Sequence, residues 1–179
     1  MRTNENAWNV AIAADDIPET GLHVEIEAPA EVRAAIADVA GLRELPRLSA
    51  NFDLIRQGSR VTVTGQVDAT VGQTCVVTLE PIESRVEEPV SLVFAPLPQG
   101  IAAGSDADRG RKRAGEPPEP LRDGHIDLGA VATEFLILGI DPYPRKAGAL
   151  FTPPEPSDGG PHPFAALEAL KKRSGSQKS

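Results

Sequence analysis

The first half of the chain alternates apolar and polar residues with the two-residue period of half-buried β-strands. Residues 22–27 alternate leucine, valine and isoleucine with histidine and glutamate, and the same period returns over residues 48–54, 61–69 and 85–94. Successive side chains of a strand point to opposite faces, so this pattern separates an apolar face from a polar one. It predicts a sheet with one apolar and one polar face.

Short turns connect these strands, which favours antiparallel pairing of neighbours. Residues 75–79 form a further short alternating run that predicts another strand. Pro89 has no N–H to give to a central ladder. The strand over residues 85–94 is therefore expected at an edge of the sheet, or bulged at the proline.

The segment between Pro29 and Gly41 has the spacing of a helix. Val32, Ile36 and Val39 recur at three- and four-residue intervals, as the buried stripe of an amphipathic helix does. Proline is common near a helix start and glycine just past its end. We expect a helix that packs this stripe on the sheet.

A second helix is predicted over residues 127–139. Asp127 is a good N-cap residue and Gly139 is placed to end the helix. A helix that is hydrophobic nearly all round belongs in a core, and this one carries apolar residues on both sides: Leu128, Val131, Phe135 and Leu138, then Ala132, Leu136 and Ile137.

These elements predict an α+β fold, namely a twisted antiparallel sheet covered by one or two helices. The sheet either stays open or curls into a partial barrel. We expect a single domain over residues 1–150, interrupted at about 96–124 by a long mobile loop of proline, glycine and charged residues. A linker over residues 151–161 and a basic amphipathic tail over residues 162–179 follow.

The tail has the features of a helix that forms on a partner. Glu168 and Lys172 have the favourable i, i+4 order, but three helical turns are marginally stable alone in water. Apolar positions make a stripe and basic residues follow it. The residues expected to bind a partner are Pro163, Phe164, Leu167, Leu170, Lys171, Lys172 and Arg173.

Composition narrows the class of protein. A single cysteine excludes an internal disulfide and a multi-cysteine zinc site, and it suits a reducing compartment. No apolar run approaches the roughly 20 residues that span a bilayer, and the N-terminus does not resemble a signal peptide. We therefore expect a cytoplasmic protein that does not enter a membrane.

The motifs of common enzymes are missing from the sequence. It has no phosphate-binding loop, no dinucleotide fingerprint and no nucleophile elbow. Cys75 is the one candidate nucleophile, but it lies in an apolar run and is expected to be a small core residue. We expect no catalytic activity, no cofactor, no metal and no small-molecule substrate.

The net charge of −8 is unevenly distributed. The tail is basic, and so is a cluster within the predicted loop, which leaves an acidic body. A short basic segment either contacts a polyanion such as RNA or only keeps a loop soluble. The cluster consists of Arg109, Arg111, Lys112 and Arg113.

Three stretches of the chain are distinctive when taken in order. The first is GQVDATVGQTCVVTLEPIESRVEEPVSLVFAP, the second is EPPEPLRDGHIDLGAVATEFLILGIDPYPRK, and the third is PHPFAALEALKKR. Together they cover about half of the chain, and they resemble the YceD family of large ribosomal RNA subunit accumulation proteins. The third stretch is similar to the closing motif of that family.

The resemblance implies a role in accumulation of the large-subunit ribosomal RNA, without catalysis or a cofactor. Many relatives have a Cys-x-x-Cys pair where this sequence reads Cys75-Val76-Val77-Thr78. Because Thr78 replaces the second cysteine, any metal site of those relatives is expected to be lost here. The strands on either side would then be held by packing alone.

Two hypotheses follow. The first is a non-catalytic factor in large-subunit biogenesis, whose acidic body binds a ribosomal protein or a precursor particle. Its basic loop and tail would then touch ribosomal RNA locally. The second is a general protein-interaction adaptor unrelated to RNA.

Overall fold

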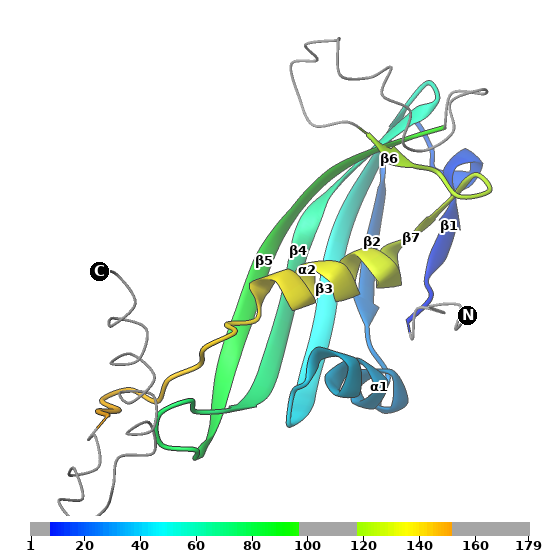
Figure 1. Ribbon diagram of the computed structural model, residues 1–179. Helices are drawn as coiled ribbons and strands as arrows, with labels where there is room; N and C mark the ends of the chain where they lie inside the picture. The colour runs from blue at the N-terminus through cyan, green and yellow to red at the C-terminus, as the bar shows by residue number, and fades with distance from the viewer. Residues whose placement is uncertain (1–7, 97–117, 152–179) are drawn as a thin grey trace, which may run out of the picture. The chain divides into compact units, whose positions relative to one another are not determined.

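The computed structural model describes residues 8–96 and 118–151. The chain divides into two units, residues 1–149 and 150–179, and all helices and strands named below belong to the first. In chain order they are β1 (Ala11–Ala13), the short 3-10 helix η1 (Ala14–Asp16), β2 (Leu22–Glu27), α1 (Ala30–Ala40), β3 (Glu44–Gln57), β4 (Arg60–Thr74), β5 (Pro81–Ala95), β6 (Glu119–Pro120), β7 (His125–Asp127) and α2 (Leu128–Gly139) (Figure 1).

The described strands form one large sheet and one small one. The large sheet has the order β2-β3-β4-β5-β6, and the small one pairs β1 with β7. Strands β2 to β5 are antiparallel neighbours, whereas β6 pairs in parallel with β5. The α+β class is confirmed. Of the two predicted forms of the sheet the open one is observed, and the two-residue β6 makes it mixed.

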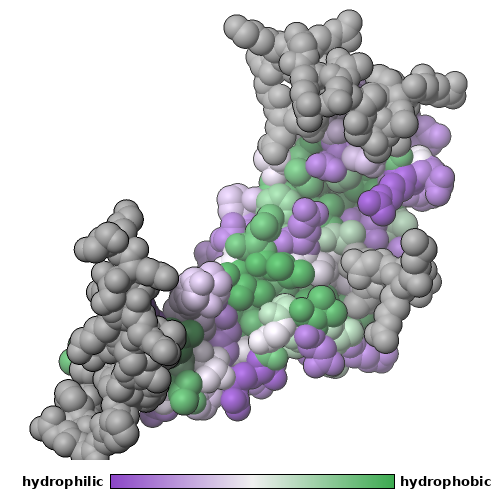
Figure 2. All heavy atoms as spheres, viewed as in Figure 1, coloured by the Kyte–Doolittle hydropathy of each residue, from purple (hydrophilic) through white to green (hydrophobic). Residues whose placement is uncertain are grey.

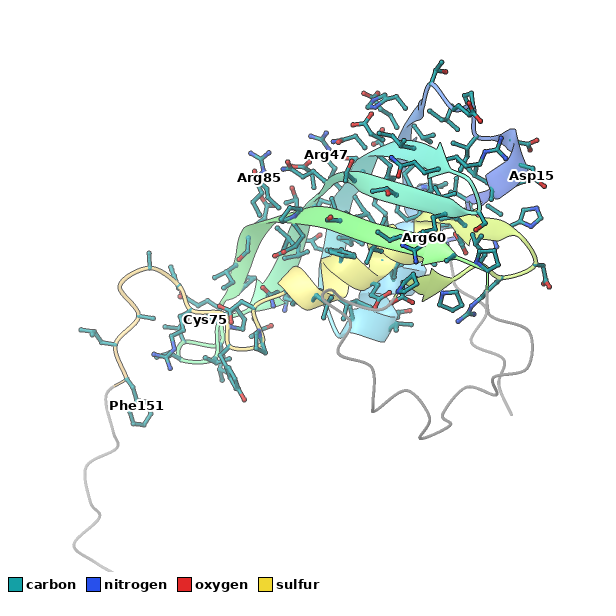
Figure 3. All side chains as sticks on the ribbon, turned by 90° about the horizontal axis from the view of Figure 1, so that it is seen from above. Asp15, Arg47, Arg60, Cys75, Arg85 and Phe151 are labelled. Atoms are coloured by element: carbon teal, nitrogen blue, oxygen red, sulfur yellow. The ribbon has the colours of Figure 1, made fainter. Side chains whose placement is uncertain are left out.

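Both helices cover the same face of the sheet, here called the inner face (Figures 1 and 3). Helix α1 packs on β3, while α2 crosses β4 and β5. The alternating apolar positions predicted on the strands lie on this face and are buried, because each fully buried valine, leucine or phenylalanine is worth about 1.5–3 kcal/mol. They include Leu48, Ala50, Phe52, Leu54, Val61, Val63, Val67, Ala69 and Val90.

Helix α1 ends where the sequence predicts, but the side that it turns toward the sheet differs from the predicted one. Gly41 caps it with φ +67°, a left-handed conformation that favours glycine. Ile36 is buried, whereas Val39 is 80% exposed, so the prediction that Val39 faces the core is wrong. The side chain of Arg33 fixes the helix by donating to the carbonyls of Ala28 and Leu45.

Helix α2 begins at Asp127, as predicted, and its Oδ1 accepts a hydrogen bond from the N–H of Ala130. The predicted burial on all sides is wrong. Leu136 is fully buried, but Ile137 is 43% and Leu138 72% exposed, because only one side of the helix meets the sheet. Gly139 has no positive φ; a Cβ there would meet side chains of Val86 and Glu88, so this glycine allows close packing.

Two local predictions need correction. Residues 75–79 form the connection between β4 and β5 instead of a strand, and Leu79 is 76% exposed with φ +60°. The predicted loop at about 96–124 extended too far, because Glu119 and Pro120 pair with the end of β5. This short strand could not be predicted from its polar sequence, because backbone hydrogen bonds to β5 hold it in place. Neither helix among the described residues is long and apolar enough to cross a membrane.

Candidate functional site: an acidic sheet face

The face of the large sheet opposite the helices, here called the outer face, is polar and acidic. It presents the strand residues that alternate with the core positions. Its acidic residues are Glu25, Glu27, Glu44, Asp53, Asp68, Glu83 and Glu87, and its arginines are Arg47, Arg60 and Arg85. Arg47 and Arg85 project from this face, away from both helices (Figure 3). The outer face is thus a negatively charged platform.

The register of the strands concentrates this charge in one row. Glu27 pairs with Ser49, Ser49 with Asp68, and Asp68 with Glu87, so one row across four strands holds three carboxylates. Neighbouring strands lie about 4.8 Å apart. Carboxylates on this row are therefore close enough to act together on one cationic partner.

Arg85 neutralises part of this row. Its Nη2 lies 3.3 Å from Oδ1 of Asp68 and its Nε lies 2.6 Å from Oε1 of Glu87. Exposed pairs of this kind contribute only about 0–1 kcal/mol, because water screens them. One guanidinium shared by two carboxylates leaves the row negative, and the unpaired lone pairs remain available as acceptors.

His23 joins two further carboxylates of the outer face. Its Nδ1 lies 2.7 Å from Oδ1 of Asp53, and its Nε2 lies 3.6 Å from Oε1 of Glu25. The hydrogen bond to Asp53, followed by the one to Glu25, raises the pKa of His23 above its usual 6.5. Protonation of His23 therefore makes the outer face less negative in mildly acidic solution.

The Asp53→Asn variant is expected to lower the pKa of His23, measured by NMR titration of the imidazole signals. A raised folded pKa means that the stabilisation from the His23–Asp53 pair is complete below pH 6.5 and is lost as pH rises through the folded pKa. Glu25→Gln should lower this pKa less, since Asp53 has the larger influence. A His23 midpoint that Asp53→Asn leaves unchanged contradicts this assignment.

Uncharged hydrogen-bonding residues fill the space between the charges. They are Ser49, Asn51, Thr62, Thr64, Gln66, Thr70 and Ser91. Such a face can accept hydrogen bonds from lysine and arginine side chains over several strands. It repels phosphate, because the carboxylates of this face outnumber its arginines.

Cys75 lies at the end of the sheet where β4 leads into β5, in the connection between these two strands (Figure 3). Its side chain is buried, as predicted. The Sγ accepts hydrogen bonds from the N–H of Lys146 at 3.3 Å and of Thr78 at 3.4 Å. The bond from Lys146, with those from Thr78, lowers the pKa of the thiol to about 6.

The connection at Cys75 is also tied to the chain beyond α2. The N–H of Val76 donates to the carbonyl of Pro144 at 2.9 Å, and Lys146 Nζ lies 2.9 Å from Glu80 Oε2. Gln73 Nε2 donates to the carbonyl of Asp141 at 2.8 Å. The expectation that packing alone holds these strands is therefore wrong, because hydrogen bonds from residues 141–146 hold them as well. Within the described ranges, no three or more His, Cys, Asp or Glu side chains are placed so that they could hold a metal ion together.

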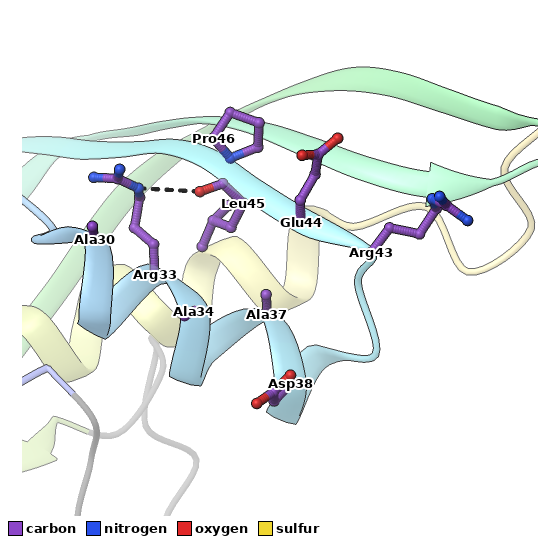
Figure 4. A pocket seen from close by; sticks show the side chains of 9 residues that line it. All are labelled: Ala30, Arg33, Ala34, Ala37, Asp38, Arg43, Glu44, Leu45 and Pro46. Carbon is purple, nitrogen blue, oxygen red and sulfur yellow. Dashed lines mark hydrogen bonds between the residues drawn. The ribbon is translucent and has the colours of Figure 1, made fainter.

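A hollow of about 340 Å³ lies between α1 and the start of β3 (Figure 4). Its helical wall is formed by Ala30, Ala34 and Ala37. The guanidinium of Arg33 beside it already donates to main-chain carbonyls, to that of Leu45 at 3.1 Å. Asp38, Arg43 and Glu44 also line the hollow, but their side chains point in different directions (Figure 4). The hollow therefore lacks the converging polar groups that orient a small ligand.

The residues predicted to bind a partner lie outside the described residues, both in the tail and in the basic cluster at Arg109–Arg113. The outer face was visible in the sequence only as a solvated surface. Glu27, Asp68 and Glu87 are far apart along the chain, and only the strand register places them in one row. Recognising the row from sequence would have required knowing which residues pair.

Comparison with known proteins supports the resemblance noted in the sequence. The family model described as large ribosomal RNA subunit accumulation protein YceD matches residues 63–171, more than half of the chain. This range begins within β4 and includes Asp68, Cys75 and Glu87. A search of curated proteins found no match, and neither did a search of solved structures. On the extent of the family match, the chain belongs to the YceD family.

Proposed function

We propose that this protein is a non-catalytic factor in large ribosomal subunit biogenesis whose outer face binds a basic ribosomal protein or precursor particle. The family name supplies the link to large-subunit ribosomal RNA. The row of Glu27, Asp68 and Glu87 carries the proposal for the partner's chemistry. Ribosomal proteins that bind RNA must present cationic surfaces, and an acidic face that covers such a surface prevents premature contact with RNA.

The basic segments have a second role in this proposal. The outer face repels phosphate, so RNA contact falls to Arg109–Arg113 and to Lys171, Lys172 and Arg173. The apolar stripe of Phe164, Leu167 and Leu170 would dock in a groove of the particle, as amphipathic helices do. The acidic face would hold the protein partner while the basic segments hold the particle.

Neutralising the acidic row tests this proposal. The variant Glu27→Gln/Asp68→Asn/Glu87→Gln is expected to bind purified large-subunit proteins roughly tenfold more weakly, since three exposed charge contacts are worth about 1–2 kcal/mol together. Binding is measured by retention of these proteins on the immobilised chain as their concentration is varied.

A matched control carries the same change of charge away from the outer face. Asp16, Glu19 and Glu31 are exposed and lie outside the large sheet, so Asp16→Asn/Glu19→Gln/Glu31→Gln should bind as the unmodified chain does. Equal losses in the two triple variants would show that only net charge matters. No loss in either would exclude the outer face as the binding surface.

The exposed Ile137 and Leu138 on α2 favour a second candidate, a protein-interaction adaptor with an apolar interface. Salt separates the two functions. Binding through the outer face weakens as ionic strength rises, because mobile ions screen exposed charges. Binding through an apolar interface changes little, or strengthens in kosmotropic salts.

A further inference from the structure

Among the residues that the structure describes, strand β5 forms an edge of the sheet along most of its length. On one side it pairs with β4 from Pro81 to Phe94 without a register shift. On the other side β6 covers only Phe94 and Ala95 (Figure 1). The prediction of an edge position for Pro89 is confirmed, and the ladder continues through Pro89 without a bulge.

The proline reveals which backbone groups of β5 face outward. Pro89 has no N–H, and it pairs with Gln66 inside an uninterrupted ladder, so position 89 directs its backbone groups away from β4. Backbone direction alternates along a strand. Ala95 supports this assignment, since it lies an even number of residues from Pro89. Its carbonyl accepts a hydrogen bond from the N–H of Leu121 at 3.0 Å, on the side of β5 away from β4.

The N–H and C=O groups of Glu83, Arg85 and Glu87 therefore point to the open side of β5. Within residues 8–96 and 118–151, these groups make no hydrogen bond. An unpaired row of donors and acceptors is a template for one more strand. Pro89 ends this row, since it offers no donor. We call these three residues the β5 edge.

The side chains around the β5 edge select the strand that would add to it. On the outer face, Glu83, Arg85 and Glu87 lie beside the new strand, with Asp68 next to Glu87. Arg85 pairs with Asp68 and Glu87 and offsets only part of this negative charge. A second copy of this chain would place its own glutamates against Glu83 and Glu87, which is unfavourable. A strand with lysine or arginine on that face is attracted.

The inner side of the same edge is apolar at Val86, which lies between Ser84 and Glu88, and along the neighbouring turn of α2. Val86 and Glu88 meet the C-terminal end of α2 at Gly139, and the exposed Ile137 and Leu138 belong to that turn of the helix. Apolar residues gather over α2 on this side of the molecule (Figure 2). A strand beside β5 would thus have basic side chains on one face and apolar side chains on the other.

We propose that the β5 edge binds an extended segment of the partner protein, with alternating basic and apolar residues, as an additional strand of the sheet. The inference rests on the proposed function for the nature of the partner. The added strand receives main-chain hydrogen bonds from Glu83, Arg85 and Glu87, and its basic side chains extend the contact onto the outer face. Strand addition of this kind takes affinity from the main chain and specificity from alternate side chains.

A short peptide of alternating lysine and valine is a probe for this site. Its binding is measured by fluorescence anisotropy, and hydrogen exchange of the full chain locates it. On peptide addition the amides of Glu83, Arg85 and Glu87 should exchange on the order of tenfold more slowly, because each becomes hydrogen-bonded. Peptide binding that leaves these three amides unprotected overturns the proposal without the use of any variant, and so does a lack of binding.

Proline substitution separates main-chain from side-chain contact. Glu87→Pro removes an N–H that points away from β4, as the backbone of Pro89 does. Glu87→Gln removes only the charge of the side chain. We expect Glu87→Pro to weaken peptide binding on the order of tenfold more than Glu87→Gln does. Ser91→Pro, which places the same change beyond Pro89, should leave binding unchanged. Equal effects of Glu87→Pro and Glu87→Gln, or an equal loss in Ser91→Pro, would contradict strand addition.

The outcome is independent of the test of the outer face. If the neutralised acidic row weakens binding of large-subunit proteins but the β5 edge amides stay unprotected, the proposed function stands and this inference fails. If the neutralised row has no effect while the amides are protected by the peptide, the edge binds strands but the proposed partner is wrong.

Discussion

Replacing Gly65 by alanine is expected to lower the free energy of unfolding by about 3 kcal/mol, the upper range for added atoms in a packed interior. Gly65 lies in the middle of β4, opposite Phe52 of β3. A Cβ at this position would collide with the backbone carbonyl of Asn51. A backbone group cannot rotate away as a side chain can, so β3 and β4 would have to separate at the centre of the sheet.

Gly72 provides the matched control for this prediction. It lies on the same strand, and a Cβ there would meet Cγ of the Glu44 side chain at 2.5 Å. That flexible side chain can move toward solvent, so Gly72→Ala should cost about 1 kcal/mol or less. Urea denaturation gives both values. If Gly65→Ala lowers the free energy of unfolding as little as Gly72→Ala does, then β3 and β4 are not in close contact at Gly65.

Local pattern was sufficient to predict the central strands. The side chains of Phe52, Val63 and Val67 are fully buried, as the two-residue period requires. Burial of one face decides these positions, because a shift by one residue would expose the entire apolar set. The cap at Gly41 was also predictable, since a left-handed residue at a helix end strongly favours glycine.

Predictions failed where distant residues decide the outcome. Val39 fits the apolar period of α1, yet the helix contacts the sheet through Ile36 and leaves Val39 in solvent. Cys75 looked like a strand residue, but its environment is set by the N–H of Lys146, 71 residues away. Glu119 and Pro120 form a strand only because the end of β5 is beside them.

The candidate site illustrates the same limit. Alternation predicts that Glu25 and Glu27 face water, but not that Glu27 shares a row with Asp68 and Glu87. Pro89 did indicate an edge strand from sequence alone. The direction of the neighbouring backbone groups needed the register, which then placed the donors of the β5 edge. Alternation could show which residues face solvent, whereas their grouping into a surface depends on pairing between strands.

Removal of the Asp127 side chain is expected to lower the free energy of unfolding by about 2–4 kcal/mol, because two backbone amides lose their acceptor. Oδ1 of Asp127 accepts from the N–H of Ala130 at 3.1 Å and from the N–H of Val10 at 3.0 Å, and both bonds are partly buried. The first bond caps α2, as the sequence predicts. The second could not be predicted, since Val10 lies 117 residues away.

The Asp127→Asn variant separates the bonds from the charge. Asparagine keeps an oxygen acceptor and is nearly as good an N-cap as aspartate, so its cost should stay below about 1 kcal/mol. In Asp127→Ala the amides of Val10 and Ala130 should both exchange faster with solvent, since one oxygen serves both. Faster exchange at Ala130 alone would mean that Asp127 acts only as a cap. Because Leu128 N–H also donates to the carbonyl of Val10 at 2.9 Å, faster exchange at both would show that this carboxylate joins the residue before β1 to the start of α2.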